Sequence, residues 1–250
     1  LGIRGRNDAV PSRGASSNAI FLRDAPGSLV SASATCGHSS AAGAGVHIEG
    51  DATGTIIRGS FIAGWGGELE TEGVDLASCG GAAPWIVDNS EINAEGPLVA
   101  PVIAIRSRGD CHPVIERNVR IVSGYEGRGV PTAILCGPDP SSGTSSRCVI
   151  ERNPFIRSTS FGFPTVSTGV RCEGRGCARI VMNDISAFQG IAIVGLFLGP
   201  TDAFVARNRI SGGCASASAV GVQALDSAAR LENNLIFGGL PCSGGTAGTA

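Results

Sequence analysis

The stretch Val114-Ile115-Glu116-Arg117-Asn118-Val119-Arg120-Ile121 belongs to a motif that recurs along most of the 250-residue chain. The copies are Ile56–Ile62, Ile86–Ile92, Val114–Ile121, Val149–Ile156, Ile180–Ile185, Phe204–Ile210 and Leu231–Ile236. Their asparagines are Asn89, Asn118, Asn153, Asn183, Asn208 and Asn234, and the first copy has Gly59 at this place. The spacing averages about 29 residues, which is typical of a repeat architecture.

A second series of short apolar segments keeps the same period. Its members are Val46–Ile48, Val74–Leu76, Ile103–Ile105, Ala133–Leu135, Val170–Cys172, Leu196–Leu198 and Val222–Ala224. These segments are short, rich in β-branched residues and often alternate apolar with polar residues, a pattern that indicates strands rather than helices. Each repeat is therefore predicted to contain a strand, a loop, a second strand, an asparagine turn and a third short strand.

A single coil of about 29 residues cannot bury its apolar face, but identical coils stacked about 4.8 Å apart can. We expect the asparagines to adopt the left-handed conformation at one corner, as Gly59 would, and to bond to each other between coils. With these features the sequence resembles the right-handed parallel β-helix family (the pectate-lyase-like superfold), as found in secreted bacterial repeat proteins. The resemblance implies an all-β, right-handed parallel β-helix of about eight coils. It does not fix a function, because that fold carries lyases, hydrolases, epimerases, adhesins and structural rods.

The same pattern predicts the domain organisation. Residues 1–16 are expected to be an irregular N-terminal cap or the remnant of a preceding coil, and residues 17–242 the parallel β-helix. Residues 243–250 are expected to be a flexible Gly/Thr/Ala tail or linker. Because the chain begins with Leu1 and Cys36 has no predicted partner, we expect a portion of a longer protein, with coils missing before Leu1.

Nine cysteines without a Cys-x-x-Cys pair suggest disulfide bonds in loops rather than metal ligands. The expected pairs are Cys136 with Cys148, Cys172 with Cys177, Cys214 with Cys242, and Cys79 with Cys111. Disulfide bonds imply an oxidising compartment, so we expect an extracellular or cell-surface protein of bacterial type. Buried thiols in a cytosolic protein are the alternative.

Composition excludes several classes of function. A net charge of −2 argues against a nucleic-acid partner, which would need a basic face. The sequence has no apolar run long enough for a transmembrane segment. All nineteen basic residues are arginines, so no lysine can serve as a base or form a Schiff base. No cofactor or metal is expected, although Ca²⁺ remains an option without a recognisable site.

Two groups of ionisable residues are candidate catalytic sites. His47 and Asp75 occupy equivalent places in consecutive copies, so stacking predicts that they are neighbours on the outer face. With Ala104 and Ile134 continuing that row, the pair lacks a third partner, which favours a surface ion pair over a catalytic couple.

The second group is Arg106, Arg108, Asp110 and His112, which we expect in one loop. Asp110 with His112 could be part of a lyase-type site, which needs a base and often Ca²⁺. A solvated loop of mixed charge is the alternative.

Aromatic residues follow the last isoleucine of several copies. They are Trp65, Tyr125, Phe161 and Phe188, and Leu98 interrupts the row. Aromatic rings along one edge can stack on sugar rings, so Trp65 and Tyr125, together with Arg106 and Arg108, are candidate ligand-binding residues. Capping of the coil interior is the alternative.

The absence of the motifs of known enzymes favours a structural function. The first hypothesis is an exported, non-catalytic β-helix that displays loops as a fibre, adhesin or envelope component. Its expected partners are a second copy joined end to end, other envelope proteins or a polysaccharide. The alternative is a carbohydrate-active enzyme (a polysaccharide lyase or hydrolase) or a polysaccharide-binding module.

Overall fold

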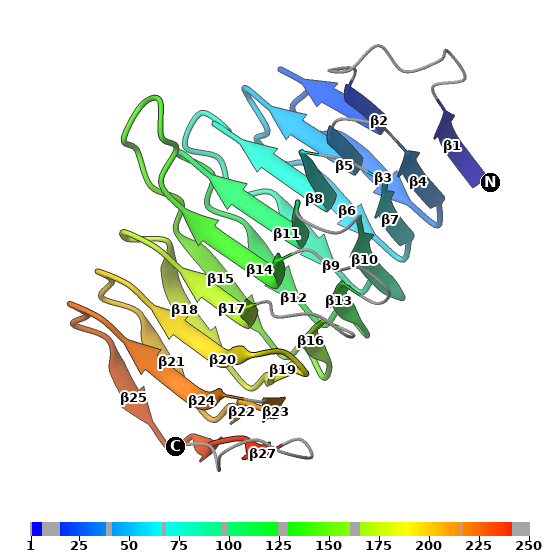
Figure 1. Cartoon of the computed structure of the whole chain (residues 1–250). Helices are drawn as coiled ribbons and strands as arrows, with labels where there is room; N and C mark the ends of the chain where they lie inside the picture. The colour runs from blue at the N-terminus through cyan, green and yellow to red at the C-terminus, as the bar shows by residue number, and fades with distance from the viewer. Residues whose placement is uncertain are drawn as a thin grey trace.

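The computed structural model describes residues 2–6, 16–38, 42–66, 69–96, 100–124, 130–160, 166–215 and 217–241. In these ranges the chain forms strands and no helix, and the strands wind into a parallel β-solenoid (Figure 1). The solenoid makes about seven turns of about 28 residues, which is close to the eight coils predicted from the repeat. None of the described residues forms a helix that is long and apolar enough to cross a membrane.

Each turn contributes one strand to each of three parallel sheets, in the chain order sheet B, sheet C, sheet A. Sheet A contains β1 (Gly2–Arg6), β4 (Ala34–His38), β7 (Phe61–Trp65), β10 (Glu91–Glu95), β13 (Ile121–Ser123), β16 (Ile156–Thr159), β19 (Asp184–Phe188), β22 (Arg209–Ser211) and β26 (Leu235–Phe237). Sheet B contains β2 (Ser16–Arg23), β5 (Ala42–Glu49), β8 (Glu70–Ala77), β11 (Pro101–Arg108), β14 (Val130–Gly137), β17 (Val166–Cys172), β20 (Ala192–Leu198) and β24 (Ser218–Ala224).

Sheet C contains β3 (Leu29–Ser31), β6 (Ile56–Arg58), β9 (Trp85–Val87), β12 (Val114–Glu116), β15 (Cys148–Glu151), β18 (Cys177–Val181), β21 (Phe204–Ala206) and β25 (Arg230–Glu232). A separate pair, β23 (Cys214–Ala215) and β27 (Leu240–Pro241), lies outside the three sheets. The strand β1 pairs with β4, so residues 2–6 add one more strand to sheet A.

The interior is a column of aliphatic side chains with one ladder from each sheet. Because neighbouring strands pair in register, a residue lies beside its counterpart in the next coil, and we call such a set a row. Sheet B supplies the row Val46, Val74, Ile105, Ile134, Val170 and Leu196; sheet C supplies Ile57, Ile86, Ile115, Ile150, Ile180 and Val205; sheet A supplies Ile62, Ile92, Ile121, Ile156, Ile185 and Ile210. β-Branched residues fit such stacked strands well, which explains their repetition in the sequence.

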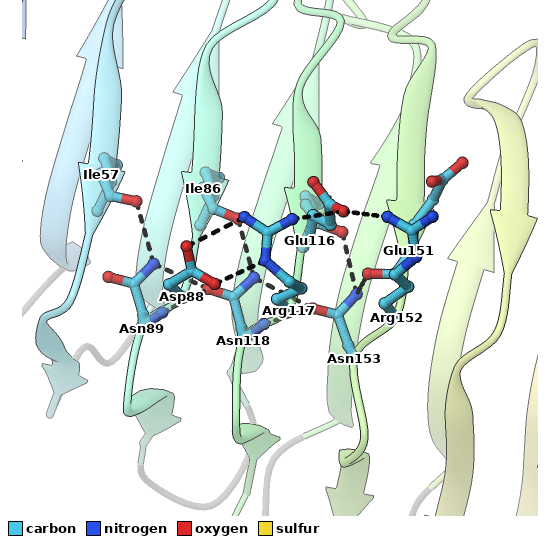
Figure 2. A network of polar contacts seen from close by, with 11 residues as sticks. Ile57, Ile86, Asp88, Asn89, Glu116, Arg117, Asn118, Glu151, Arg152 and Asn153 are labelled. Atoms are coloured by element: carbon cyan, nitrogen blue, oxygen red, sulfur yellow. Dashed lines mark hydrogen bonds and ion pairs between the residues drawn. The ribbon is translucent and has the colours of Figure 1, made fainter.

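The asparagines form a continuous ladder between sheets C and A. In the central part, Nδ2 of Asn89 donates to Oδ1 of Asn118 at 2.8 Å, and Nδ2 of Asn118 donates to Oδ1 of Asn153 at 3.1 Å (Figure 2). Each of these amides also donates to a strand carbonyl of the preceding coil, as Asn118 does to Ile86 at 2.9 Å. The ladder continues through Asn183, Asn208 and Asn234. The asparagines thus satisfy backbone groups that the turn leaves without a strand partner.

The prediction that the asparagines themselves take the left-handed conformation is wrong. Positive φ occurs one residue earlier, for example at Asp88 (53°) and Arg117 (53°). Gly59 (58°) belongs to this preceding row, and Ser60 occupies the asparagine row of its coil, where its N–H donates to Oδ1 of Asn89. The asparagine amide must face the ladder, so the sharp turn is made by its neighbour.

The residues in the left-handed row carry a second, charged ladder on the outside. Arg117 binds Asp88 through Nε (2.8 Å) and Nη2 (3.1 Å), and its Nη1 lies 2.6 Å from Glu116. Arg152 of the next coil also binds Glu116, at 2.7 Å (Figure 2). Arg117 and Asp88 are both exposed, so this pair contributes about 0–1 kcal/mol, whereas Glu116 is buried beneath its two arginines.

Three disulfide bonds have the predicted partners but not the predicted surroundings. They join Cys79 with Cys111, Cys136 with Cys148 and Cys172 with Cys177. All six residues are fully buried in the hydrophobic core rather than in exposed loops. Cys214 is also disulfide-bonded, while its predicted partner, Cys242, lies outside the described residues.

The disulfide bonds should differ in what they contribute to stability. Cys79 and Cys111 belong to consecutive coils and are 32 residues apart, whereas Cys172 and Cys177 are 5 apart. Closing the longer loop removes more entropy from the unfolded chain, so we expect Cys79→Ala/Cys111→Ala to lower the free energy of unfolding by about 4 kcal/mol and Cys172→Ala/Cys177→Ala by about 2 kcal/mol. Urea unfolding of both double variants measures this, and the reverse order would contradict it.

The pairing between the strands of sheet B is interrupted at a row of small residues, and we call this interruption the bend. The row comprises Gly45, Gly73, Ala104, Ala133, Gly169, Gly195 and Gly221. A Cβ atom on Gly73 would lie 2.6 Å from the carbonyl oxygen of Ala104 and 2.7 Å from that of Asn93, so a larger side chain does not fit there. This bend decides which residues of sheet B meet on the outer face.

Candidate functional site

Seven charged residues gather on the outer face of sheet B, where β5, β8 and β11 lie side by side. This charged cluster consists of His47, Glu49, Glu70, Glu72, Asp75, Arg106 and Arg108. In-register pairing aligns His47 with Asp75 and Asp75 with Arg106. Three consecutive coils therefore place an imidazole, a carboxylate and a guanidinium in one row.

His47 is held between two carboxylates. Its Nδ1 lies 2.7 Å from Oδ2 of Asp75, its Nε2 lies 3.3 Å from Oε2 of Glu49, and the ring of Phe21 stacks on it with a centroid distance of 5.3 Å. Burial would lower the pKa of His47, but the hydrogen bonds and negative charges of Asp75 and Glu49 outweigh it and raise the pKa above its usual value. When protonated, the imidazolium donates to both carboxylates and has no lone pair with which to accept a proton.

Asp75 joins all three coils and is almost fully buried. Its Oδ1 accepts from Nε of Arg106 at 2.9 Å, and its Oδ2 lies 3.3 Å from Nη2 of Arg108 in addition to the contact with His47. Burial would raise the pKa of Asp75, but the hydrogen bond from His47 and the charge of Arg106 hold it well below its usual range. The carboxylate is therefore ionised and fully engaged.

Arg106 uses its whole guanidinium within the cluster. Besides Nε on Asp75, its Nη1 pairs with Glu70 and its Nη2 lies 2.8 Å from Oε1 of Glu72. The side chain is only 9% exposed. Burial would lower the pKa of Arg106, but the neighbouring carboxylates raise it instead, so the residue stays charged.

Glu72 is the least satisfied member of the cluster. It is buried, and its Oε1 has no hydrogen bond although Arg106 is at ion-pair distance, because the contact lacks hydrogen-bond geometry. Burial raises the pKa of Glu72 well above its usual value; Arg106 opposes the shift, whereas the charges of Asp75 and Glu70 add to it. The folded state therefore favours the protonated carboxyl.

Glu72→Gln should stabilise the protein in a pH-dependent way. Below a pH of about 4.3 the wild-type carboxyl is protonated in both states, so the variant gains nothing. As the pH rises, the unfolded chain ionises Glu72 more readily than the folded protein does, and the wild type alone loses stability. Urea unfolding at increasing pH should show that the free energy of unfolding of Glu72→Gln increasingly exceeds that of the wild type. Glu91→Gln, at the half-buried partner of Arg120, is the control. A loss of stability of Glu72→Gln relative to the wild type as the pH rises would contradict the prediction.

Arg106 is the partner that the predicted register of the repeats missed. The predicted row placed Ala104 and Ile134 beside Asp75, whereas the observed row contains Arg106 and Leu135. The conclusion that His47 and Asp75 lack a third partner is therefore wrong. The missed signal is the small residue followed by an aliphatic one at the bend, as in Gly73-Val74 and Ala104-Ile105, which fixes the register across all coils.

The second group of ionisable residues is divided by the structure. Arg106 and Arg108 belong to β11 rather than to a loop, while Asp110 and His112 follow in the turn on either side of the disulfide-bonded Cys111. Asp110 Oδ1 and His112 Nδ1 are buried and have no hydrogen-bond partner in the described parts of the chain. No ion pair joins them to the charged cluster among the described residues, so they do not complete it.

The aromatic residues do not form a continuous platform next to the cluster. Trp65 is exposed at the end of β7 in sheet A, and its row reaches Phe188 only after Glu95, Gly124 and Thr159. Tyr125, Phe161 and Leu98 lie outside the described residues. The aromatic ring that contacts the cluster is Phe21, which the sequence did not single out.

The geometry limits what the cluster can do chemically. A general base needs a free lone pair and a general acid needs a proton within reach of the substrate. His47 and Asp75 use these capacities on each other and on their neighbours, whereas Oε1 of Glu72 has no hydrogen-bond partner among the described residues. Among the described residues, no three histidine, cysteine or acidic side chains are arranged to hold a metal ion.

No family model matches the sequence, and comparisons with curated proteins and with solved structures give no match. The fold therefore defines the class of this chain, a disulfide-bonded parallel β-solenoid with an internal asparagine ladder.

Proposed function

We propose that this chain is an exported β-solenoid without catalytic activity, which displays loops on its repeat scaffold as a component of a cell surface, envelope or fibre. The observation that carries this proposal is the saturation of the three central residues of the charged cluster, His47, Asp75 and Arg106. Both nitrogens of His47, both oxygens of Asp75 and all three nitrogens of Arg106 contact groups of the same protein. Such a network ties three coils together and leaves these groups no capacity for a substrate.

Export is supported by the disulfide bonds. Three bonds link pairs of fully buried cysteines, and such bonds persist in oxidising compartments but are rare in the cytosol. The resemblance of the repeat to secreted bacterial β-helix proteins points the same way. Mass spectrometry of the protein from its native cells, unfolded in denaturant in the presence of a thiol reagent, tests this: Cys79 and Cys111 should resist alkylation, and alkylation of both would contradict export.

A turnover screen tests the absence of catalysis. The purified protein would be incubated with polyuronides and with neutral glycans, and unsaturated products and new reducing ends would be measured. We expect no turnover above that of Asp75→Asn, in which the cluster loses its central charge. Turnover by the wild type but not by Asp75→Asn would overturn the proposal.

End-to-end association with a second copy or with other envelope proteins is part of the proposal. Its support is the parallel arrangement, because a further strand of the same direction extends any of the three sheets. Electron microscopy at high protein concentration should show rods longer than one solenoid. Uniform single rods under those conditions would count against self-association and leave other envelope proteins as partners.

A carbohydrate-active enzyme is the second candidate, and Glu72 is the observation in its favour. A buried carboxyl with a raised pKa and an oxygen without a hydrogen bond is typical of a general acid. If the turnover screen gives products, Glu72→Gln should abolish them while the variant remains folded. Unchanged turnover in this variant would exclude Glu72 as the acid.

A further inference from the structure

Sheet B carries a pocket of about 170 Å³ beside the charged cluster. Its lining includes Arg108, Leu135, Gly137, Pro138, Pro140 and Glu173. The two prolines come from the loop of residues 138–147 between β14 and β15, which extends from the solenoid in green in Figure 1. The pocket thus combines the repeat scaffold with a displayed loop.

Contacts within the protein hold this loop in place. The disulfide bond between Cys136 and Cys148 closes its base. Inside the loop, Oδ1 of Asp139 accepts from the backbone N–H of Ser141 at 2.8 Å, and Oδ2 accepts from the hydroxyl of Ser78 at 3.2 Å. Because Ser78 follows β8, the loop reaches back across two coils and forms a fixed wall beside Arg108.

The floor of the pocket is open because of one glycine. Gly137 pairs with Arg108 on one side, and on the other side it lies next to Glu173. Two coil steps of about 4.8 Å separate the backbones at Arg108 and Glu173 by about 10 Å. A Cβ atom on Gly137 would come within 3.3 Å of Cβ and 3.6 Å of Oε2 of Glu173. Any side chain at this position would therefore project into the space between Arg108 and Glu173, which we call the gap.

The gap is lined by a hydrogen-bond donor and an acceptor that face it from opposite coils. Nη2 of Arg108 contacts Asp75, while Nε and Nη1 have no hydrogen-bond partner within the described ranges. Oε1 of Glu173 binds Arg171 at 2.6 Å, while Oε2 has no such partner there. Each charge is already balanced by an ion pair, so the pocket offers hydrogen bonds without a net charge. Leu135, Pro138 and Pro140 add apolar surface.

We propose that this pocket binds one hexopyranose unit of a neutral glycan. This inference rests on the proposed function, because a loop displayed on the scaffold builds the site. Neighbouring hydroxyls of the sugar accept from Arg108 and donate to Glu173, and an apolar face of the ring packs on Leu135 and the prolines. A carboxylate ligand would be repelled by Glu173, and a cation by Arg108. The volume is below that of sites for drug-sized ligands, which suits a single sugar ring.

Amide chemical-shift titrations test the proposal. The probes are the methyl glycosides of glucose, galactose and mannose, with galacturonate as the charged comparison. We expect at least one neutral glycoside to shift the amides of Gly137 and Glu173 with a Kd of about 1 mM, the affinity of a ligand this small. Galacturonate should bind at least about tenfold more weakly, a difference of about 1.4 kcal/mol.

Variants then locate the site. Arg108→Leu and Glu173→Gln should each weaken binding about tenfold or more, and Gly137→Val, which fills the gap, should abolish it. Arg209→Leu, which removes an exposed arginine of sheet A, is the control and should bind as the wild type does. The proposal is overturned if no neutral glycoside shifts these amides, if galacturonate binds more tightly, or if the folded pocket variants bind normally. None of these results bears on the thiol status or on the turnover screen, which test the proposed function separately.

Discussion

Asp75→Ala is expected to lower the free energy of unfolding by about 3 kcal/mol. Removing one partner of a buried ion pair leaves a charge that is neither solvated nor balanced, which typically costs about 3–5 kcal/mol. The lower end applies because Glu70 still pairs with Arg106. The loss should be seen in urea unfolding near neutral pH, where both His47 and Arg106 contact the carboxylate in the wild type.

The matched control is Asp184→Ala. Asp184 also pairs with an arginine of the next coil, Arg209, at 3.4 Å, but both side chains are well exposed on sheet A. Exposed pairs contribute about 0–1 kcal/mol, so this variant should be nearly as stable as the wild type. Equal losses in the two variants would show that burial of the cluster contributes nothing to its stabilising effect.

Asn118→Ala is expected to cost about 2–4 kcal/mol, since it interrupts the ladder at its centre. The amide donates to Ile86 and Asn153 and accepts from both the backbone and the side chain of Asn89 (Figure 2). The backbone N–H of Asn89 would then be buried without a partner. Thermal and urea unfolding measure the loss, and a variant as stable as the wild type would contradict the role of the ladder.

Asn234→Ala is the control for that prediction. Asn234 makes the same kinds of bonds, with Val205 and Asn208, but it is only partly buried. Water can replace its lost hydrogen bonds, so the loss should be about 1 kcal/mol. If both variants lose equal stability, the cost arises from local turn geometry rather than from burial in the ladder.

The stacked fold was predictable because two independent signals share one period. The asparagine at the turn and the aliphatic residues of sheet B each repeat with the coil, and the interior can be filled only if equal positions stack. The disulfide partners followed from their spacing around Pro138-Asp139-Pro140 and Glu173-Gly174. Their burial did not follow, since spacing says nothing about which way a side chain points.

The candidate site was only partly predictable because alternation fails at the bend of sheet B. Glu72 and Asp75 are three residues apart, yet both contact Arg106 on the outer face. A flat strand would place them on opposite faces. In β11 the run Val102-Ile103-Ala104-Ile105 is apolar throughout, so hydrophobicity gives no register there, and the alignment slipped by two residues.

The left-handed turn residue was missed for a related reason. Asparagine is the residue type that tolerates positive φ best after glycine, so the pattern favoured Asn118 over Arg117. The ladder needs the amide of Asn118 inside, at a buried position, and this requirement outweighs local preference. A rule based on single residues cannot anticipate a hydrogen bond to the next coil.

The proposed function depends most on both ring nitrogens of His47 being occupied by its two carboxylate partners, Asp75 and Glu49. Nitrogen-15 NMR of the imidazole ring, titrated against pH and assigned with His47→Asn, measures this directly. We predict that both ring nitrogens remain protonated above a pH of about 6.5, because Asp75 and Glu49 raise the pKa. A neutral ring at that pH, with a free lone pair on Nε2, would contradict the account and make His47 available as a base.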